Sequence, residues 1–151
     1  MTSVTEVAAP AANGRATTNK MSIVMFSGTA DKFIPLGVLA QAAAAMGMEV
    51  EIFVTGFALR AFTKAHPDMP FPAEFTDMAP ALAQGMEASH VASWDTMLRQ
   101  GRELGAKVHV CSMMCEVMGL TLDDFDTELV DDMVGAATFV QSAEGGETFF
   151  I

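Results

Sequence analysis

The sequence predicts a single α/β domain, built on a mostly parallel sheet of about five strands with helices on both faces. Its length of 151 residues is typical of one domain. Hydrophobic residues make up 51% of the chain and charged residues 18%, which is enough apolar material for a sizeable core. Short apolar runs alternate with segments of helical composition, and this alternation favours a parallel sheet between two helical layers.

The first third of the chain contains one complete strand–helix–strand unit. Residues 1–19 are rich in Ala, Thr and Pro and are expected to form a flexible tail before a domain over residues 20–151. A β-branched apolar run predicts a strand over 20–26, and a run rich in Ala, Leu and Met predicts a helix over 33–48. The run 49–57 predicts the second strand. A right-handed βαβ unit is the simplest arrangement of these elements.

The middle of the chain, residues 58–92, shows no clear periodicity. It holds four of the six prolines, and we expect a long variable excursion with one short helix over 77–86. Long loops on a compact domain often carry function or contact other subunits. The excursion is therefore a candidate interaction segment.

The last third resumes the alternation of helices and strands. Ser93 is a suitable N-cap for the next helix, and Gly119 is a suitable end for a short helix after the third strand. Thr121 is a suitable cap for a turn over 122–125. The predicted elements are a helix over 94–104, a strand over 107–110, a helix over 112–119, a strand over 127–134, a helix over 135–143 and a strand over 147–151.

The chain is strongly acidic, with a formal net charge of −11 and a sequence pI near 4.4. This charge argues against nucleic acid or an anionic membrane as a partner, because both select for clustered Lys and Arg. Residues 108–151 contain nine acidic residues and no Lys or Arg. Two interpretations of this acidic segment stay open: a solvated face that keeps the protein soluble, or a docking surface for a basic partner.

Location and redox state are inferred from signals that the sequence lacks. The N-terminus shows no basic segment followed by an apolar one, as a secretory signal would. No window holds 18 apolar residues free of charge. Two cysteines are too few for a disulfide scaffold in a chain of this length. We therefore expect a cytoplasmic protein with reduced thiols and no membrane segment.

Both cysteines lie in the stretch 110-VCSMMCEVMG-119, at the end of the predicted third strand. Cys111 falls where this strand ends and a helix begins, the place where catalytic groups of parallel α/β sheets gather. The free N–H groups and partial positive charge of a helix start stabilise a thiolate, the species that attacks a sulfane sulfur or a mixed disulfide. The acidic residues that follow oppose this effect if their carboxylates lie close to the thiol.

Cys115 and His109 are the candidate neighbours of Cys111. Residues four apart on a helix have Cβ atoms about 5–6 Å apart, whereas a disulfide needs roughly 3.5–4.5 Å. We expect the two thiols to face the same region, with Cys115 as a secondary, resolving thiol or as a buried packing residue. His109 lies two residues before Cys111, which places both side chains on one sheet face. It is either structural or active beside the thiol.

A loop and a soft-metal centre are further candidate sites. The loop 27-SGTADK-32 follows a strand and opens a helix, so it is a candidate anion or substrate loop, with a plain βα turn as the alternative. Lys32 would bring positive charge to Cys111 if the strands that carry the two loops are adjacent. The thiols and nearby methionines would suit Cu(I). No zinc spacing or nucleotide-binding motif is present, and no cofactor is expected. The candidate loop residues are Ser27, Gly28, Asp31 and Lys32.

Two segments of the chain carry a family resemblance. The segment 20-KMSIVMFSGTADKFIPLGVLAQAAAAMGMEVEIFVTGF-57 contains a strand, a Ser-Gly-x-x-Asp-Lys loop, an Ala-rich helix that ends in Ala-Met-Gly, and a second strand. The segment 107-KVHVCSMMCEVMGL-120 contains Cys-x-Met-x-x-x-Val-Met-Gly after a strand. Together they resemble the DsrE/DsrF-like family of sulfur-relay proteins, in particular its small soluble DsrE-type members, some of which are described as peroxiredoxin-like. Residues 58–92 do not match well.

The resemblance implies a DsrE-like, five-stranded α/β domain and a function in sulfur transfer. Cys111 falls on the signature cysteine of the family, so it is the residue implied to carry sulfur as a persulfide. Cys115 falls where many relatives have Met, and its role is not carried over. Homo-oligomers such as trimers or hexamers, and TusA-like or rhodanese-like partners, are also implied. The alternatives that stay open are an oligomeric interaction protein of the same fold and a copper binder.

Overall fold

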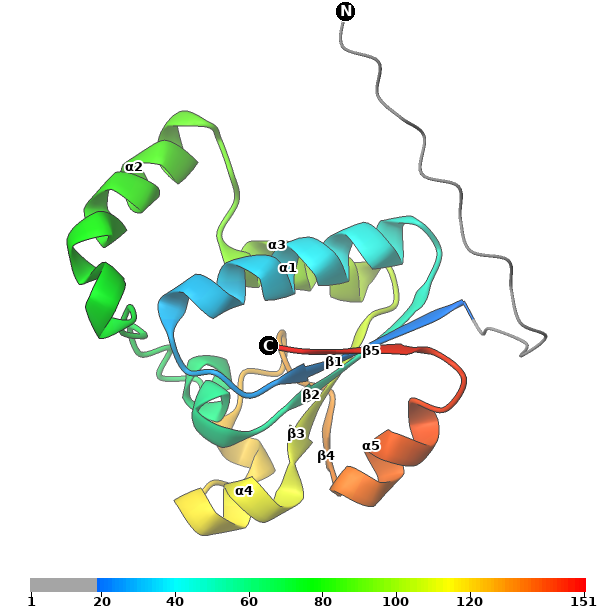
Figure 1. Cartoon of the computed structure of the whole chain (residues 1–151). Helices are drawn as coiled ribbons and strands as arrows, with labels where there is room; N and C mark the ends of the chain where they lie inside the picture. Colours follow the sequence, from blue (N-terminus) through cyan, green and yellow to red (C-terminus); the bar gives the residue numbers. More distant parts are fainter. Residues whose placement is uncertain (1–18) are drawn as a thin grey trace, which may run out of the picture.

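The computed structural model of the protein describes residues 19–151, so the predicted tail lies outside the described residues except for Asn19. Figure 1 shows one sheet of five parallel strands in the order β4-β3-β2-β1-β5. Within residues 19–151 no helix has the length and apolar composition needed to cross a membrane. The strands are β1 (Lys20–Met25), β2 (Glu49–Val54), β3 (Lys107–Cys111), β4 (Asp132–Val134) and β5 (Glu147–Phe150); the α-helices are α1 (Ala30–Ala45), α2 (Ala79–Ala88), α3 (Trp94–Glu103), α4 (Ser112–Met118) and α5 (Ala136–Ser142); the 3-10 helices are η1 (Gly56–Phe62), η2 (Ala73–Met78) and η3 (Leu122–Asp124).

The sheet confirms the predicted α/β class. β1 and β2 pair in parallel from Lys20 with Glu49 to Met25 with Val54, and α1 is the crossover between them. The predicted strand–helix–strand unit is therefore present. β5 pairs with β1 and forms one edge of the sheet, while the short β4 pairs with β3 and forms the other.

The helices lie on both faces of the sheet, as predicted. α1 and α3 pack together over one face, and α5 lies on the other (Figure 1). From β1 through β2 and β3 to β4, each strand is added next to the one before it, in the same direction along the sheet. The last connection runs the opposite way, from β4 back across the sheet, and places β5 beside β1. Because crossovers between parallel strands are right-handed, a reversal of direction moves the connecting helix to the opposite face. The position of α5 follows from this one reversal.

The main core lies between the sheet and the layer formed by α1 and α3. Ile23, Ile52 and Val108 are neighbours in the three central strands, and all are fully buried. Leu36 and Leu98 meet them from the helices and are also fully buried. Side chains alternate between the two faces of a strand, and a smaller buried cluster lies under α5.

The fourth strand is shorter than the sequence predicts. A strand is expected over 127–134, but β4 begins only at Asp132. A turn explains the difference, since the N–H groups of Leu129 and Val130 donate to the carbonyl of Asp126 at 3.0 and 2.9 Å. The carboxylate of Asp126 also accepts the N–H of Glu128 at 2.8 Å, and side-chain acceptors of this kind compete with strand ladders. Backbone bonding to β3 begins at Asp131, whose N–H donates to the carbonyl of Val108 at 2.9 Å.

The excursion predicted over residues 58–92 has two parts that pack differently. η1 is folded into the core, and its Leu59 and Phe62 are fully buried. η2 and α2, residues 73–88, contain no buried residue and are termed the arm. Figure 1 shows the arm standing away from the sheet. The short helix predicted over 77–86 is present as α2, which begins two residues later.

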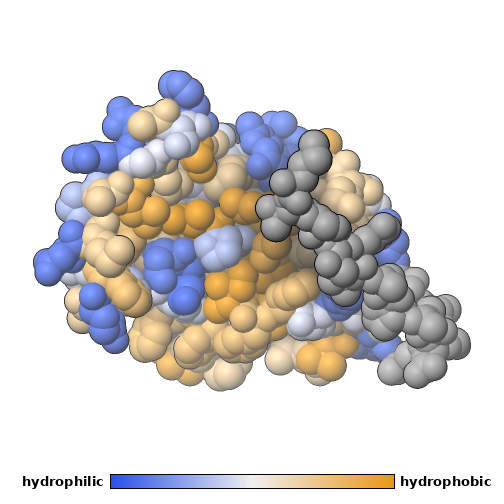
Figure 2. Space-filling model, turned by 45° about the horizontal axis from the view of Figure 1, so that its top comes forward, coloured by the Kyte–Doolittle hydropathy of each residue, from blue (hydrophilic) through white to orange (hydrophobic). Residues whose placement is uncertain are grey.

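Figure 2 shows a face on which hydrophobic residues form a band that is broken by a small hydrophilic patch. Large apolar side chains are exposed both on α1, as at Val38, and on the arm, as at Phe75 and Met78. Monomeric proteins rarely expose extended apolar patches. The exposed apolar side chains of α1 and of the arm are therefore candidates for contact with a partner.

The close approach of α1 and α3 depends on Gly37. A Cβ built on Gly37 would lie 2.8 Å from the carbonyl oxygen of Trp94. We expect Gly37→Ala to lower the free energy of unfolding by about 1–3 kcal/mol, because the helices must move apart. Gly85→Ala in α2 is the matched control, because a Cβ built on Gly85 has nothing within 4 Å. We expect this change to raise the free energy of unfolding by about 0.5–1 kcal/mol. Urea unfolding measures both, and a Gly37→Ala variant as stable as wild type would contradict the prediction.

Candidate functional site

Cys111 is the last residue of β3 and the N-cap of α4, with extended backbone angles of φ −70° and ψ 114°. The position predicted for it, at a strand end and a helix start, is therefore observed. α4 ends at Gly119, whose left-handed φ of 68° lets the N–H of Leu120 reach the carbonyl of Cys115 at 2.8 Å. Local sequence signals thus define both ends of the short helix that follows the thiol.

The Cys111 thiol is buried beneath α5. Cys111 is 3% exposed and packs with Phe53 of β2 and Phe139 of α5. The two aromatic rings stack with their centroids 4.8 Å apart and their planes 15° apart. Phe139 is the one buried residue of α5. Sequence reasoning did not single out either ring, because neither residue lies near Cys111 in the chain.

Cys115 packs in the main core, where it is fully buried. Burial, with a smaller contribution from the nearby Cys111, raises the pKa of the Cys115 thiol to about 11, so it stays protonated at neutral pH. Both cysteines are free thiols. The two thiols belong to different hydrophobic clusters, although Met114 contacts both clusters and Cys111 lies near enough to affect the pKa of Cys115.

His109 lies on the same sheet face as Cys111, with Phe53 of β2 as its register partner. Its Nδ1 forms a hydrogen bond of 2.5 Å with Oδ1 of Asp132 in β4. The imidazole therefore pairs with the neighbouring strand and helps to tie the short β4 to β3.

Residues 27–32 form a βα turn whose backbone donors bond within the protein. The N–H of Ser27 donates to the carbonyl of Ile151 at 3.2 Å, and the N–H of Ala30 donates to the carbonyl of Pro70 at 2.8 Å. An anion in this loop would need such donors. The protein's own carbonyls already occupy these two.

Gly28, Asp31 and Lys32 complete this turn. Gly28 lies so close to Phe57 that a Cβ on it would be 2.7 Å from the Cβ of Phe57. α1 begins three residues before its predicted start, so Asp31 and Lys32 join its first turn, where their charged groups lie 3.7 Å apart. β2 lies between β1 and β3. The strands that carry Lys32 and Cys111 are therefore not adjacent, and the condition for placing Lys32 beside the thiol is not met.

The acidic segment is partly neutralised by ion pairs. These pairs hold the turn after α4 against α3 and tie β4 to β3, so this part of the segment is not free to dock a basic partner. Four of the nine acidic residues in 108–151 take part, namely Asp126, Glu128, Asp131 and Asp132, and their partners are His66, Arg99, Arg102, Lys107 and His109.

Asp131 links β3 to α3, and its role predicts a pH dependence. Burial alone raises its pKa, but hydrogen bonds from Arg102 (2.8 Å) and the N–H of Val108 (2.7 Å) outweigh burial and hold the pKa of Asp131 below its usual range. The stabilisation is present above about pH 4 and is lost as the pH falls through the lowered pKa. We expect Asp131→Asn to lower the free energy of unfolding by about 1–3 kcal/mol at pH 7 and by less at pH 3. Urea unfolding at both pH values measures the two differences, and equal differences would contradict the prediction.

A group of three polar side chains, termed the latch, ties α5 to the sheet. The ammonium of Lys20 lies 3.1 Å from Glu51 and donates to Oγ of Ser142 at 3.0 Å, and Ser142 donates to Glu51 at 2.5 Å. Ser142 is the last residue of α5. α5 is thus held by Phe139 and by the latch, and a cavity of about 270 Å³ lies beside it, lined in part by Phe53 and Phe139.

Within residues 19–151 no three His, Cys, Asp or Glu side chains lie close enough to hold an ion. Of the soft donors considered for copper, Cys111 lies under α5, Cys115 lies in the main core, Met114 contacts both clusters, and Met113 is 60% exposed.

The fold and the site define a class of small α/β proteins in which a free cysteine stands between the third strand of a parallel sheet and a short helix. The sequence model of the DsrE/DsrF/DrsH-like family matches residues 17–79 and 69–150. The chain belongs to this family, which confirms the resemblance seen in the sequence.

Two relatives are similar to this chain in sequence, and one solved structure is similar to it in fold. YrkE of Bacillus subtilis, an uncharacterised protein, is 28% identical over 154 residues, covering 85% of this chain and 94% of YrkE. The sulfur carrier protein DsrE2 of Allochromatium vinosum is 28% identical over 153 residues, covering 82% of this chain and 92% of DsrE2. A conserved protein of unknown function from Bacteroides thetaiotaomicron, BT1422, has the same fold, with a TM-score of 0.56 at 14% identity over 92% of this chain and 100% of that protein.

Proposed function

We propose that the protein is a sulfur carrier that holds sulfane sulfur as a persulfide on Cys111. Family membership and the 28% identity to a protein named as a sulfur carrier support the general function. The observation that carries the choice of residue is the position of Cys111, which ends β3 and caps α4. The partial positive charge of a helix start favours an anionic sulfur, as a thiolate or as a persulfide.

The transfer needs no external oxidant. The Cys111 thiolate attacks the outer sulfur of a donor persulfide, a new S–S bond forms on Cys111, and the donor's S–S bond breaks to release the donor as a thiolate. Attack by an acceptor thiolate on the outer sulfur of the loaded Cys111 reverses these steps. Cys115 is unsuited to this attack, because its raised pKa of about 11 keeps it as a thiol.

The test of this proposal is intact mass spectrometry after incubation with a sulfane-sulfur donor. We expect the wild type and Cys115→Ser to gain the mass of sulfur, and Cys111→Ser to gain none. Dithiothreitol should remove the added mass. Loading that survives the loss of Cys111 would refute the assignment of this residue.

The proposal includes a homo-oligomer, a trimer or hexamer, that works in the cytoplasm and exchanges sulfur with TusA-like or rhodanese-like proteins. The exposed rings of Phe26, Phe57 and Phe150 support an interface, since Phe26 lies 6.4 Å from Phe57 and 6.0 Å from Phe150 between centroids. Native mass spectrometry gives the subunit number. A monomer at micromolar concentration would contradict the oligomer.

A second candidate function is an oligomeric interaction protein of the same fold. The arm favours it, because residues 73–88 contain no buried residue and expose Phe75 and Met78. In that case the wild type gains no sulfur in the mass measurement. It should also still bind its partner after both thiols are alkylated.

A further inference from the structure

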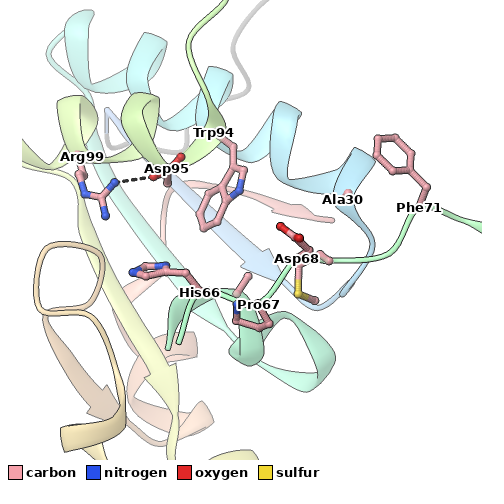
Figure 3. A pocket seen from close by; sticks show the side chains of 10 residues that line it. Ala30, His66, Pro67, Asp68, Phe71, Trp94, Asp95 and Arg99 are labelled. Carbon is pink, nitrogen blue, oxygen red and sulfur yellow. Dashed lines mark hydrogen bonds and ion pairs between the residues drawn. The ribbon is translucent and has the colours of Figure 1, made fainter. Parts of the chain in front are cut away.

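A cavity of about 550 Å³ lies outside the carboxyl ends of β1 and β2, next to the starts of α1 and α3. This is the usual place for ligands in parallel α/β folds, and the volume is that of a small-molecule site. Figure 3 shows side chains from α3 and from the segment after η1 pointing into it. The cavity is bordered by the main core, on the opposite side of the sheet from Cys111. It is therefore separate from the thiol.

The indole of Trp94 forms an aromatic wall of this cavity. It is held from behind by Phe33 and Phe62, whose ring centroids lie 4.8 and 5.3 Å from that of Trp94. Figure 3 shows the indole of Trp94 pointing into the cavity, with Asp95 on one side of it and Asp68 on the other. An aromatic face flanked by carboxylates suits an organic cation.

Two carboxylates, Asp68 and Asp95, and one guanidinium, Arg99, line the cavity, and Asp126 and Glu128 contact that guanidinium from outside the lining. Arg99 donates to Asp95 (2.6 Å), Asp126 (3.1 Å) and Glu128 (3.0 Å), so one guanidinium faces three carboxylates. Burial raises the pKa of Asp95 and of Asp126, but hydrogen bonds outweigh burial and hold both below their usual range, so both stay ionised. Asp68 also lines the cavity and, within the part of the chain that the structure describes, forms no ion pair.

The segment 66–70, which lines one side of the cavity, is anchored at both ends. His66 has a left-handed φ of 41°, which is unfavourable for a residue with a side chain. Its Nε2 bonds Asp126 at 2.8 Å, and the carbonyl of Pro70 accepts the N–H of Ala30 at 2.8 Å. Both ends of this loop are anchored, so the cavity is formed before any ligand arrives.

We propose that this cavity binds a monovalent organic cation, an ammonium or guanidinium group on a short apolar stem. The cation lies against Trp94 between Asp68 and Asp95, and the stem lies on Pro67 and Met69, which also line the cavity. Asp95 is already paired with Arg99, whereas Asp68 has no ion-pair partner among the described residues. An anion would be repelled by Asp68, and a neutral apolar molecule would leave it without a partner. The proposal does not depend on the sulfur-carrier function.

Trp94 is the single tryptophan of the chain, so its fluorescence reports on this cavity directly. We expect butylguanidinium and butylammonium to change the emission in a saturable way, and butanol at the same concentrations to leave it unchanged. Added salt should weaken both cations. Equal responses to butanol and the cations, or no saturable response to either cation, would overturn the proposal.

Asp68→Asn is the decisive variant, because Asp68 is exposed and its loss should not disturb the fold. We expect it to weaken butylguanidinium binding about fivefold, the effect of one unit charge a few ångströms away in a wet site. Glu74→Gln on the arm removes the same charge outside the cavity and should leave the affinity unchanged. Equal affinities in the two variants would overturn the assignment.

The cation could belong to a free metabolite or to an arginine of a partner protein, and a peptide distinguishes these sources. Acetyl-Gly-Arg-Gly-amide presents the same guanidinium on a chain. Binding at least as tight as that of butylguanidinium assigns the cavity to a partner's arginine. Binding of the free cations alone assigns it to a small molecule, and both results support the cation site.

Discussion

Replacement of Phe139 by Ala should make Cys111 react with iodoacetamide on the order of ten to a hundred times faster than in the wild type. Phe139 is the one buried residue of α5 and stacks on Phe53 beside the thiol. Burying a Phe side chain contributes about 1.5–3 kcal/mol. Without this side chain, more molecules should have α5 detached from the sheet at any moment. Their population rises about tenfold for each 1.4 kcal/mol lost from the free energy that holds α5 in place.

Cys115 is the internal control for this experiment. It is fully buried in the main core, so it reacts only when the core opens. Peptide mass analysis follows the two thiols separately. We expect the ratio of Cys111 to Cys115 labelling to rise in Phe139→Ala and to stay unchanged in Val140→Ala, which alters an exposed residue of the same helix. Equal acceleration of both thiols would show global destabilisation instead of local opening.

The second large effect is expected at the latch. The Lys20 side chain is 6% exposed and lies 3.1 Å from two carboxylates, that of Glu51 (14% exposed) and that of Glu49 (65% exposed). We expect Glu51→Gln to cost about 2–4 kcal/mol, because the buried ammonium loses its buried counter-charge. Glu49→Gln should cost less than about 1 kcal/mol, because water screens that pair. If urea unfolding gave similar losses of stability for the two variants, Glu51 would not be the main counter-charge of Lys20.

The latch should also respond to pH. Burial raises the pKa of Glu51, but hydrogen bonds from Ser142 and Lys20 outweigh burial and hold that pKa below its usual value of 4.5. The stability that Glu51 contributes is therefore present above about pH 4.5 and is lost as the pH falls through the lowered pKa. The difference in free energy of unfolding between the wild type and Glu51→Gln should therefore become smaller in acid. A difference that stays constant from pH 7 to pH 3 would contradict this role.

Much of the fold could be predicted, because its signals are local. Apolar runs marked β1 and β2 to within three residues, and Gly119 marked the end of α4 through its left-handed backbone. β4 was predicted too long, because the apolar pair Leu129 and Val130 resembles a strand, whereas the N–H groups of both residues bond to the carbonyl of Asp126 in a turn. The burial of η1 was also missed, since a 3-10 helix has no distinctive apolar period.

The candidate site was predictable in position but not in environment. By itself the sequence determined that Cys111 stands where β3 ends and α4 begins, since both signals lie within a few residues of it. Only the tertiary structure decided that Phe139 covers Cys111 and that Cys115 packs in the main core, a different cluster. Those contacts depend on which face each crossover takes, and the return of the chain to β5, far along the sequence, sets that face for α5.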